Sequence, residues 1–317
     1  MNMRSLGRSG ISVPPLCLGG NVFGWTADER QSFAVLDAAF EAGLTFIDTA
    51  DVYSRWAPGH VGGESETIIG RWMKERGARD RLVLATKVGM DMGEGKVGLK
   101  PAYIRQAVED SLRRLQTDRI DLYQAHKDDP DTPQEETLAA FAELVKAGKV
   151  RAIGASNFSA DRFRDALQIS ERLGLPRYET MQPEYNLYTR MEYETGLEPV
   201  CRDHHVAVIP FFGLAAGFLT GKYRSEADLG KSPRGERSIG RYLNPRGFAV
   251  LEALDRVAER HGATPARVAL AWLMARQSIT APIASATSPE QVRELAAATQ
   301  LKLSPEEIGQ LDDASAP

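Results

Sequence analysis

The chain has 317 residues, of which 43% are hydrophobic and 26% charged, and its formal net charge is −4. This composition is typical of a globular protein with a sizeable core, and the absence of a basic surplus argues against nucleic acid as a partner. No signal peptide and no apolar stretch of about 20 residues is present, so we expect a cytoplasmic protein without a membrane segment. Two cysteines, Cys17 and Cys201, are too few for a disulfide framework and should be reduced and buried.

The chain begins with a short segment, Met3 to Val13, in which Gly7 and Gly10 separate mixed runs and predict a small β-hairpin. Short apolar runs, typical of buried strands, then alternate with amphipathic segments. There are eight such runs: Leu16 to Leu18, Leu44 to Ile47, Leu82 to Ala85, Ile120 to Tyr123, Val150 to Ile153, Thr180 to Gln182, Val206 to Ile209 and Ala281 to Ala284.

The segments between these runs carry helix signals. Pro101 suits a first helical turn, and apolar residues follow it at helical spacing from Ile104 to Leu115. A capping box is expected at Thr132, with Gly148 ending that helix, and similar start signals occur at Ser288 and Ser304.

Strands that alternate with helices predict parallel strands joined by helical crossovers. Eight units in about 300 residues indicate a single-domain (β/α)8 TIM barrel over residues 1–317, with an N-terminal β-hairpin and extra C-terminal helices. An open doubly wound sheet is the alternative, because strand order cannot be read from the pattern. The Gly-, Pro- and Arg-rich stretch from Arg224 to Arg246 is expected to be a long functional loop.

Polar residues follow three consecutive runs at the point where each predicted strand ends. Asp48 ends the second run and Tyr53 lies in the loop after it, while Lys87 and His126 follow the third and fourth runs. Each residue alone has a structural explanation, such as capping or packing. An apolar barrel has no structural need for all four, and catalytic groups of barrels lie at these strand ends.

The four residue types together suit the protonation of a carbonyl oxygen. A tyrosine holds its proton at neutral pH, and a neighbouring ammonium group lowers its pKa. A carboxylate, here Asp48, would keep Lys87 charged, and His126 could orient a substrate carbonyl. Protonating a developing alkoxide is half of a carbonyl reduction, and the hydride for the other half implies a nicotinamide cofactor.

At these residues the sequence resembles the aldo-keto reductase family, in the bacterial branch related to potassium-channel β subunits. Asp48, Tyr53, Lys87 and His126 match the family's catalytic tetrad in order and context. The resemblance runs from Leu16 to about Leu301 and implies a TIM barrel that binds NADPH and reduces aldehydes or ketones. Tyr53 would be the general acid, and the substrate a small carbonyl compound.

The resemblance also implies cofactor contacts along the barrel rim. Ser156, Asn157 and Gln182 would bind the nicotinamide carboxamide, and Tyr185 would stack on the ring. The residues expected to line the rest of the cofactor site, together with Asp48, are Gly20, Asn21, Val22, Phe211, Phe212, Gly213, Leu214, Ala215, Gly217, Lys222, Ser285, Thr287, Gln291 and Glu294.

Two segments depart from the family pattern. Phe212-Gly213 replaces the usual Ser-Pro pair, and no arginine of the segment from Ser285 to Glu294 is an obvious partner for a 2′-phosphate. NADPH remains our expectation, with NADH as the alternative. Arg234 or Arg237 of the long loop could close over the phosphates.

Some features of the sequence fit other kinds of site or function. A G-x-G-x-x-G match from Gly93 to Gly98 follows the third run too late for a dinucleotide-binding turn, so we expect a rim loop there. A convincing set of metal ligands is lacking. A cofactor-binding interaction subunit and a dehydrogenase that oxidises a sugar or a pyridoxal-like alcohol remain as functional alternatives, and a homo-oligomer stays open. Trp25, Trp56, Phe158 and Phe212 could line an apolar substrate pocket or could simply pack.

Overall fold

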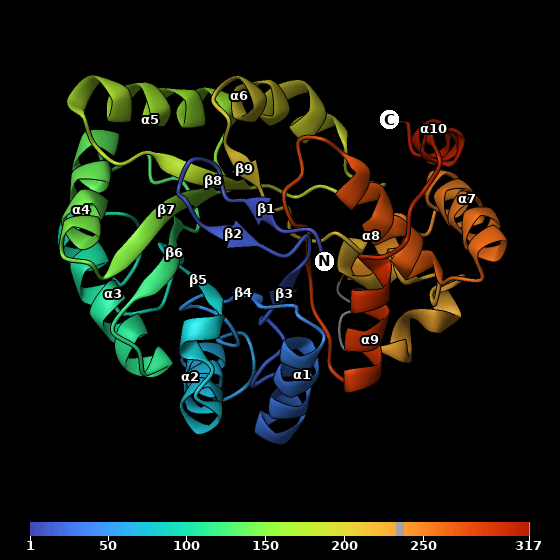
Figure 1. The fold of residues 1–317 in the computed structure, drawn as a ribbon, viewed down its shortest axis with the longest axis horizontal. Coiled ribbons are helices and arrows are strands. Elements are labelled where there is room, and N and C mark those ends of the chain that lie inside the picture. Colours follow the sequence, from blue (N-terminus) through green and yellow to red (C-terminus); the bar gives the residue numbers. More distant parts are fainter. Residues whose placement is uncertain (233–237, 317) are drawn as a thin grey trace.

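The protein is described by a computed structural model that covers residues 1–232 and 238–316. A ring of strands is surrounded by helices, and a two-stranded hairpin lies across one end of the ring (Figure 1). The hairpin consists of β1 (Arg4–Ser5) and β2 (Ser12–Val13). The parallel strands are β3 (Cys17–Gly19), β4 (Phe46–Asp48), β5 (Val83–Val88), β6 (Ile120–Ala125), β7 (Val150–Ser156), β8 (Tyr178–Gln182), β9 (Ala207–Val208) and β10 (Ile283–Ala284).

Helices follow the strands along the chain. The α-helices are α1 (Glu29–Glu41), α2 (Glu64–Arg76), α3 (Pro101–Leu115), α4 (Gln134–Lys146), α5 (Ala160–Leu173), α6 (Glu198–Asp203), α7 (Pro245–His261), α8 (Pro265–Ala275), α9 (Pro289–Ala298) and α10 (Pro305–Ala314). Shorter turns of helix are η1 (Arg79–Arg81), η2 (Tyr193–Leu197), η3 (Ala215–Thr220), η4 (Glu226–Lys231) and η6 (Gly240–Tyr242).

The eight parallel strands close into a barrel. They are hydrogen-bonded in the order β10-β3-β4-β5-β6-β7-β8-β9, so each neighbour except β10 follows in sequence. Backbone bonds join the two edges, from Thr280 N to Val208 O and from Ile283 N to Pro210 O, both 2.8 Å. The predicted TIM barrel is therefore confirmed, and the open-sheet alternative is wrong.

The hairpin seals the amino-terminal end of the barrel. Leu6, Ile11 and Val13 are almost fully buried and pack with the inward-facing residues of the strands, such as Phe46 and Leu122. Covering this end with apolar side chains leaves the polar strand ends to face the opposite, carboxyl rim. The predicted hairpin is confirmed, and its position restricts the site to the other rim.

The predicted helix starts hold with one exception. Pro101 begins α3, and Ser288 and Ser304 cap α9 and α10 with their side chains. The capping box at Thr132 was wrong, because the Thr132 hydroxyl instead donates to Asp129 at 2.7 Å and α4 has no side-chain cap. Proline before Gln134 already fixes the entry conformation there.

In the described part of the stretch from Arg224 to Arg246, the chain is more ordered than expected. This part contains η4 and η6, and α7 begins within it at Pro245. The expected phosphate partners Arg234 and Arg237 lie outside the described residues. As predicted, the glycine motif from Gly93 to Gly98 forms a loop between β5 and α3. In the described part of the chain, no helix combines the length and apolar character of a membrane span.

Candidate active site

Three strands bring the four predicted catalytic residues together at the carboxyl rim. Asp48 is the last residue of β4, Lys87 lies near the end of β5, and His126 directly follows β6. The Lys87 ammonium nitrogen lies 2.5 Å from Asp48 Oδ2 and 2.9 Å from the Tyr53 hydroxyl. It also donates to the Thr49 carbonyl at 2.8 Å. The loop after β4 therefore folds Tyr53 back over its own strand end.

Asp48 is held by donors on both of its oxygens. The amides of Gln124 and Gln182 each donate to Oδ1 at 3.0 Å, while Oδ2 receives Lys87 and, at 3.5 Å, the hydroxyl of Tyr53. Asp48 and Lys87 are 1% and 0% exposed. Because every polar group of this buried pair has partners, the burial of the two charges is compensated.

Burial and charge act in opposite directions on Lys87 and Tyr53. Burial would lower the pKa of Lys87, but Asp48 and Tyr53 raise it more, to about 12. Burial raises the pKa of Tyr53 to about 12, although Lys87 lowers it as expected. The net lowering of the tyrosine pKa that the sequence suggested is therefore not found, and Tyr53 keeps its proton at neutral pH.

His126 stands opposite Tyr53, with ring centroids 5.9 Å apart. Burial and the charge of Lys87 hold the pKa of His126 well below its usual value, so the imidazole is neutral. Its carbonyl accepts from the Asn157 amide at 2.8 Å, and its Nδ1 has no hydrogen-bond partner among the described residues. A neutral imidazole fixed in this way can hydrogen-bond a carbonyl oxygen.

Tyr53 and His126 open into a cavity of about 1130 Å³ that extends along the rim to α9. Most of the predicted cofactor residues line it: Asn21, Val22, Asp48, Ser156, Asn157, Gln182, Phe211, Phe212, Gly213, Leu214, Gly217, Lys222, Ser285, Thr287, Gln291 and Glu294. Lys87 reaches the cavity only through Tyr53 and Asp48. Gly20, Tyr185 and Ala215 are not part of the lining.

These three residues differ from their expected places for local reasons. Tyr185 is 2% exposed, packs on Tyr193 at 4.5 Å and donates to Glu194, so its ring points into the core. At Gly20 a Cβ would meet Ser65 and face α2. The cavity wall is instead formed by Gly19, where a Cβ would lie 2.6 Å from the Ser285 hydroxyl. Ala215 is fully buried.

Aromatic side chains line the cavity beside Tyr53. Trp25 and Trp56 meet edge to face at 5.6 Å, and Trp56 also packs against Tyr53. Met90, which the sequence analysis did not identify, lies with them. Phe158 does not line the cavity, because its ring packs on Tyr178 at 5.7 Å. This end of the cavity is mainly apolar around Tyr53 and His126, whereas the remaining wall mixes polar and apolar residues.

The loop after β9 lines the cavity with small residues in an unusual backbone conformation. Phe212, Ala215, Ala216 and Gly217 all have positive φ angles, between 47° and 99°. The N–H groups of Ala215 and Gly217 donate to carbonyls of the same loop, while Gly213, Ala216 and Gly217 leave room for an anion to approach the backbone closely. Lys222 lies on the same wall and has no carboxylate partner in the described part of the chain. The residues present therefore fit a pyrophosphate.

At the far end of the cavity, α8 and α9 meet through an ion pair. Glu294 accepts from Arg267 Nε at 2.9 Å and from the Thr264 hydroxyl at 3.0 Å. Arg267 was missed from the sequence, because the expected phosphate partners were Lys222, Arg234 or Arg237, and residues of the segment after the last strand. The start signal Thr264-Pro265, which places Arg267 in the first turn of α8, could have revealed it.

Comparison with known proteins agrees with this geometry. Residues 15–316 match the sequence profile of the aldo/keto reductase family. The aldo-keto reductase YhdN of Bacillus subtilis is 35% identical, covering 94% of this chain and 87% of the relative. L-glyceraldehyde 3-phosphate reductase of Escherichia coli is 32% identical over 98% of this chain and 92% of the relative.

A third relative carries a different name. A putative voltage-gated potassium channel subunit beta of Schizosaccharomyces pombe is 32% identical, over 98% of this chain and 92% of the relative. All three similarities extend over nearly the whole barrel, as does the profile match. The chain is an oxidoreductase that belongs to the aldo/keto reductase family.

Proposed function

We propose that the protein reduces an aldehyde or ketone to the alcohol with NADPH. The observation that carries this proposal is the 2.9 Å contact between Lys87 and the Tyr53 hydroxyl at the mouth of the cavity. A phenol that keeps its proton at neutral pH and is already hydrogen-bonded to an ammonium group can act as a general acid.

Each residue of the tetrad would have a distinct task. Tyr53 donates its proton to the carbonyl oxygen of the substrate, and Lys87 stabilises the phenolate that results. Asp48 holds Lys87 in place, and neutral His126 hydrogen-bonds the carbonyl oxygen and orients it. When bound, NADPH supplies the hydride that reaches the carbonyl carbon.

The residues of the cavity wall support an assignment of cofactor contacts. Ser156, Asn157 and Gln182 are neighbours on this wall, and the side-chain oxygens of Asn157 and Gln182 suit the N–H groups of a nicotinamide carboxamide. Phe211, three residues after β9, contributes an aromatic ring to the cavity wall, whereas Tyr185 points into the core. We therefore assign the stacking role to Phe211, and the pyrophosphate to the loop up to Gly217 with Lys222.

The choice of NADPH over NADH rests on cations near the adenosine end. Arg267 lies beside Glu294, and Lys222 and Lys231 line the same cavity. A 2′-phosphate could draw the Arg267 guanidinium from Glu294, because arginine binds phosphate through paired hydrogen bonds. Arg267→Ala should therefore weaken NADPH binding more than NADH binding.

The substrate would carry an apolar or aromatic group. Trp25, Trp56 and Met90 surround the position in front of Tyr53 and His126, and apolar surface buried against them would contribute to binding. A regulatory, cofactor-binding subunit is the second candidate, since one relative bears a channel-subunit name.

Fluorescence titration with NADPH and NADH, followed by turnover at 340 nm on a panel of aldehydes and ketones, tests the proposal. We expect NADPH to bind more tightly and Tyr53→Phe to keep that affinity while kcat falls by about 10²–10⁴-fold. Binding without turnover of any carbonyl would favour the regulatory subunit. Oxidation of alcohols that is faster than reduction would favour the dehydrogenase, and the absence of nucleotide binding would overturn all three.

A further inference from the structure

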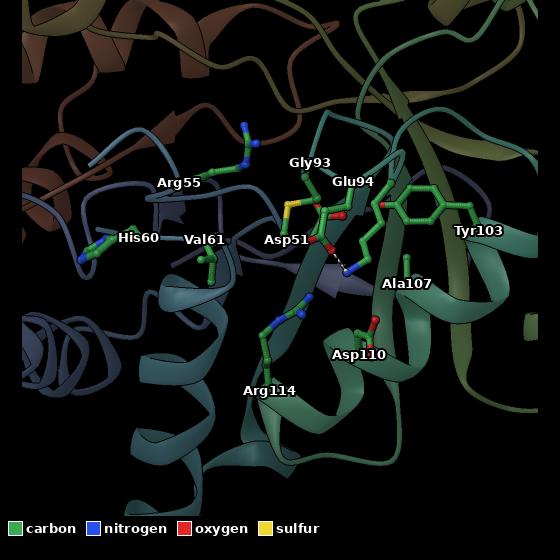
Figure 2. Close-up of a pocket in the computed structure, with 13 residues that line it drawn as sticks. Asp51, Arg55, His60, Val61, Gly93, Glu94, Tyr103, Ala107, Asp110 and Arg114 are labelled. Carbon is green, nitrogen blue, oxygen red and sulfur yellow. Dashed lines mark ion pairs between the residues drawn. The ribbon is translucent and has the colours of Figure 1, made fainter. Parts of the chain in front are cut away.

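A second cavity, of about 580 Å³, lies on the outer side of the loops that follow β4 and β5, next to α3 (Figure 2). Its volume lies within the range of small-molecule sites, roughly 300–1,000 Å³. In the described part of the chain it shares no lining residue with the catalytic cavity. The residues that form it therefore do not line the cavity in which the reaction proposed above would take place.

Asp51 forms the buried wall of this cavity. The residue is 2% exposed, and neither of its carboxylate oxygens has a hydrogen-bond partner in the described part of the chain. Its backbone N–H donates to the Lys87 carbonyl at 3.3 Å, which places Asp51 directly behind the tetrad. A buried polar group without partners is costly, so this carboxyl group calls for an explanation.

The guanidinium group beside Asp51 is already paired with another carboxylate. The neighbouring carboxylate, Glu66, is fully buried and accepts from Arg114 Nε at 2.6 Å and from the Thr86 hydroxyl at 2.5 Å. One guanidinium group thus stands beside two buried carboxyl groups. Burial, followed by the charge of Glu66, raises the pKa of Asp51 to about 8, although Arg114 and Lys87 oppose the change.

The cavity is lined by further charged residues, among them Arg55 on the loop after β4. Lys96 lies 3.7 Å from Glu94, and Asp110 is paired with Arg113. Figure 2 shows Arg114 extending from α3 toward the loop residues Asp51 and Glu94, with Tyr103 on the other side of the cavity. An anion bound here would add a negative charge beside Glu66 and would keep Asp51 protonated. A cation would favour the ionised form of Asp51 and would pair with it.

We propose that this cavity binds a small primary amine or guanidinium compound, whose cationic group pairs with the Asp51 carboxylate. The N–H groups of such a ligand satisfy the two oxygens that lack partners, and its charge balances the second buried carboxylate. Tyr103 and Ala107 line the part of the cavity that would receive the carbon atoms of the ligand.

Isothermal titration calorimetry at pH 7 with n-butylamine and with methylguanidine tests this proposal. Each titration is run in two buffers of different ionisation enthalpy. Because Asp51 is protonated in the free protein at this pH and ionised in the complex, binding should release close to one proton per ligand. We expect saturable binding of one ligand per chain.

Two variants form a matched pair. Asp51→Asn keeps the shape of the side chain but removes its charge, and should weaken binding by at least about tenfold. Asp110→Asn, in the same cavity but with the carboxylate already paired to Arg113, should bind the ligand as the wild type does. NADPH titration of both variants, which should match the wild type, verifies that each is folded.

Three results would overturn the proposal: no saturation by either compound in the millimolar range, equal affinity of Asp51→Asn and the wild type, or binding without proton release. None of these results depends on the reductase activity.

Discussion

Two buried aspartates lie three residues apart, Asp48 at the end of β4 and Asp51 in the loop after it, and they have opposite environments. Asp48 receives hydrogen bonds from Lys87, Tyr53, Gln124 and Gln182, whereas the carboxylate of Asp51 has no partner in the described part of the chain. Both are at most 2% exposed. Burial alone therefore does not decide whether a carboxyl group is ionised here. The hydrogen-bond donors around the carboxyl group decide it.

The difference follows from the side of the barrel that each residue faces. Asp48 ends β4 and points to the rim, where the neighbouring strands contribute Lys87, Gln124 and Gln182. Asp51 comes after the strand has ended and faces α2 and α3, where Arg114 is already paired with Glu66. The strands that converge on Asp48 supply hydrogen-bond donors to its carboxylate. The helices outside the barrel supply fewer such donors to Asp51.

The largest effect is expected from Asp48→Asn. The substitution leaves the Lys87 ammonium group buried without its counter-charge, and breaking a buried pair typically costs about 3–5 kcal/mol of unfolding free energy. Carbonyl reduction should be lost at the same time. Urea denaturation at pH 7 measures the change, with Asp161→Asn as the exposed control, which should change stability by about 0.5 kcal/mol or less. Unchanged stability in Asp48→Asn would mean that this pair contributes nothing net.

In contrast to Asp48→Asn, the substitution Asp51→Asn should increase the free energy of unfolding. The folded state holds a proton on Asp51 up to about pH 8, whereas the unfolded chain releases it near its ordinary pKa of about 3.9. Between these values the native state binds more protons than the unfolded state, so the stability of the wild type falls by up to about 1.4 kcal/mol per pH unit from this group. The asparagine variant removes this loss.

The measurement is urea denaturation of wild type and Asp51→Asn at a series of pH values from 4 to 9. The stability advantage of the variant should grow from pH 4 to pH 8 and then remain constant. Asp110→Asn should show no such gain, because the hydrogen bonds and charge of its arginine partner hold the pKa of Asp110 below its usual value despite partial burial. A constant difference between Asp51→Asn and wild type would show that Asp51 is ionised in the folded protein.

Most of the barrel could be predicted from the sequence, because eight apolar runs at regular spacing leave few alternatives. The position of the tetrad could also be predicted, because a polar residue directly after a buried apolar run must lie at the rim of the barrel. The orientation of individual side chains could not be predicted. Whether Gly19 or Gly20 forms the cavity wall depends on strand register, which composition does not reveal.

Tyr185 and Asp51 illustrate the same limit. Tyr185 follows a strand in the expected place, but its ring turns to Tyr193 and Trp272 because Glu194 accepts its hydroxyl. Asp51 stands within the motif that revealed the tetrad, yet nothing in the motif distinguishes a carboxylate with partners from one without. Both outcomes depend on residues far away in the sequence.

Phe211→Ala sharpens the assignment of the stacking ring. Removing an aromatic ring that contacts a planar group should weaken NADPH binding by roughly fivefold, or about 1 kcal/mol. Tyr185→Phe removes only the hydroxyl bond to Glu194 and should leave NADPH affinity unchanged. Fluorescence titration measures both. Unchanged NADPH affinity in Phe211→Ala would contradict the assignment of the stacking role to Phe211.

The smallest expected effect is on the pH dependence of kcat/KM, which should be constant if only the tetrad titrates. This pH dependence separates the tetrad from the second cavity around Asp51. The pKa of His126 lies well below its usual value and that of Tyr53 is raised to about 12, so neither changes its protonation between pH 6 and pH 9. If only these two groups affected the reaction, kcat/KM for an uncharged carbonyl would be constant over this range.

Asp51, with a pKa of about 8, is joined to the tetrad through the Lys87 carbonyl. It is the group whose titration could change kcat/KM near pH 8. A step near pH 8 that disappears in Asp51→Asn would show that the second cavity influences catalysis. A step near pH 6.5 that disappears in His126→Gln would contradict the neutral state assigned to the imidazole.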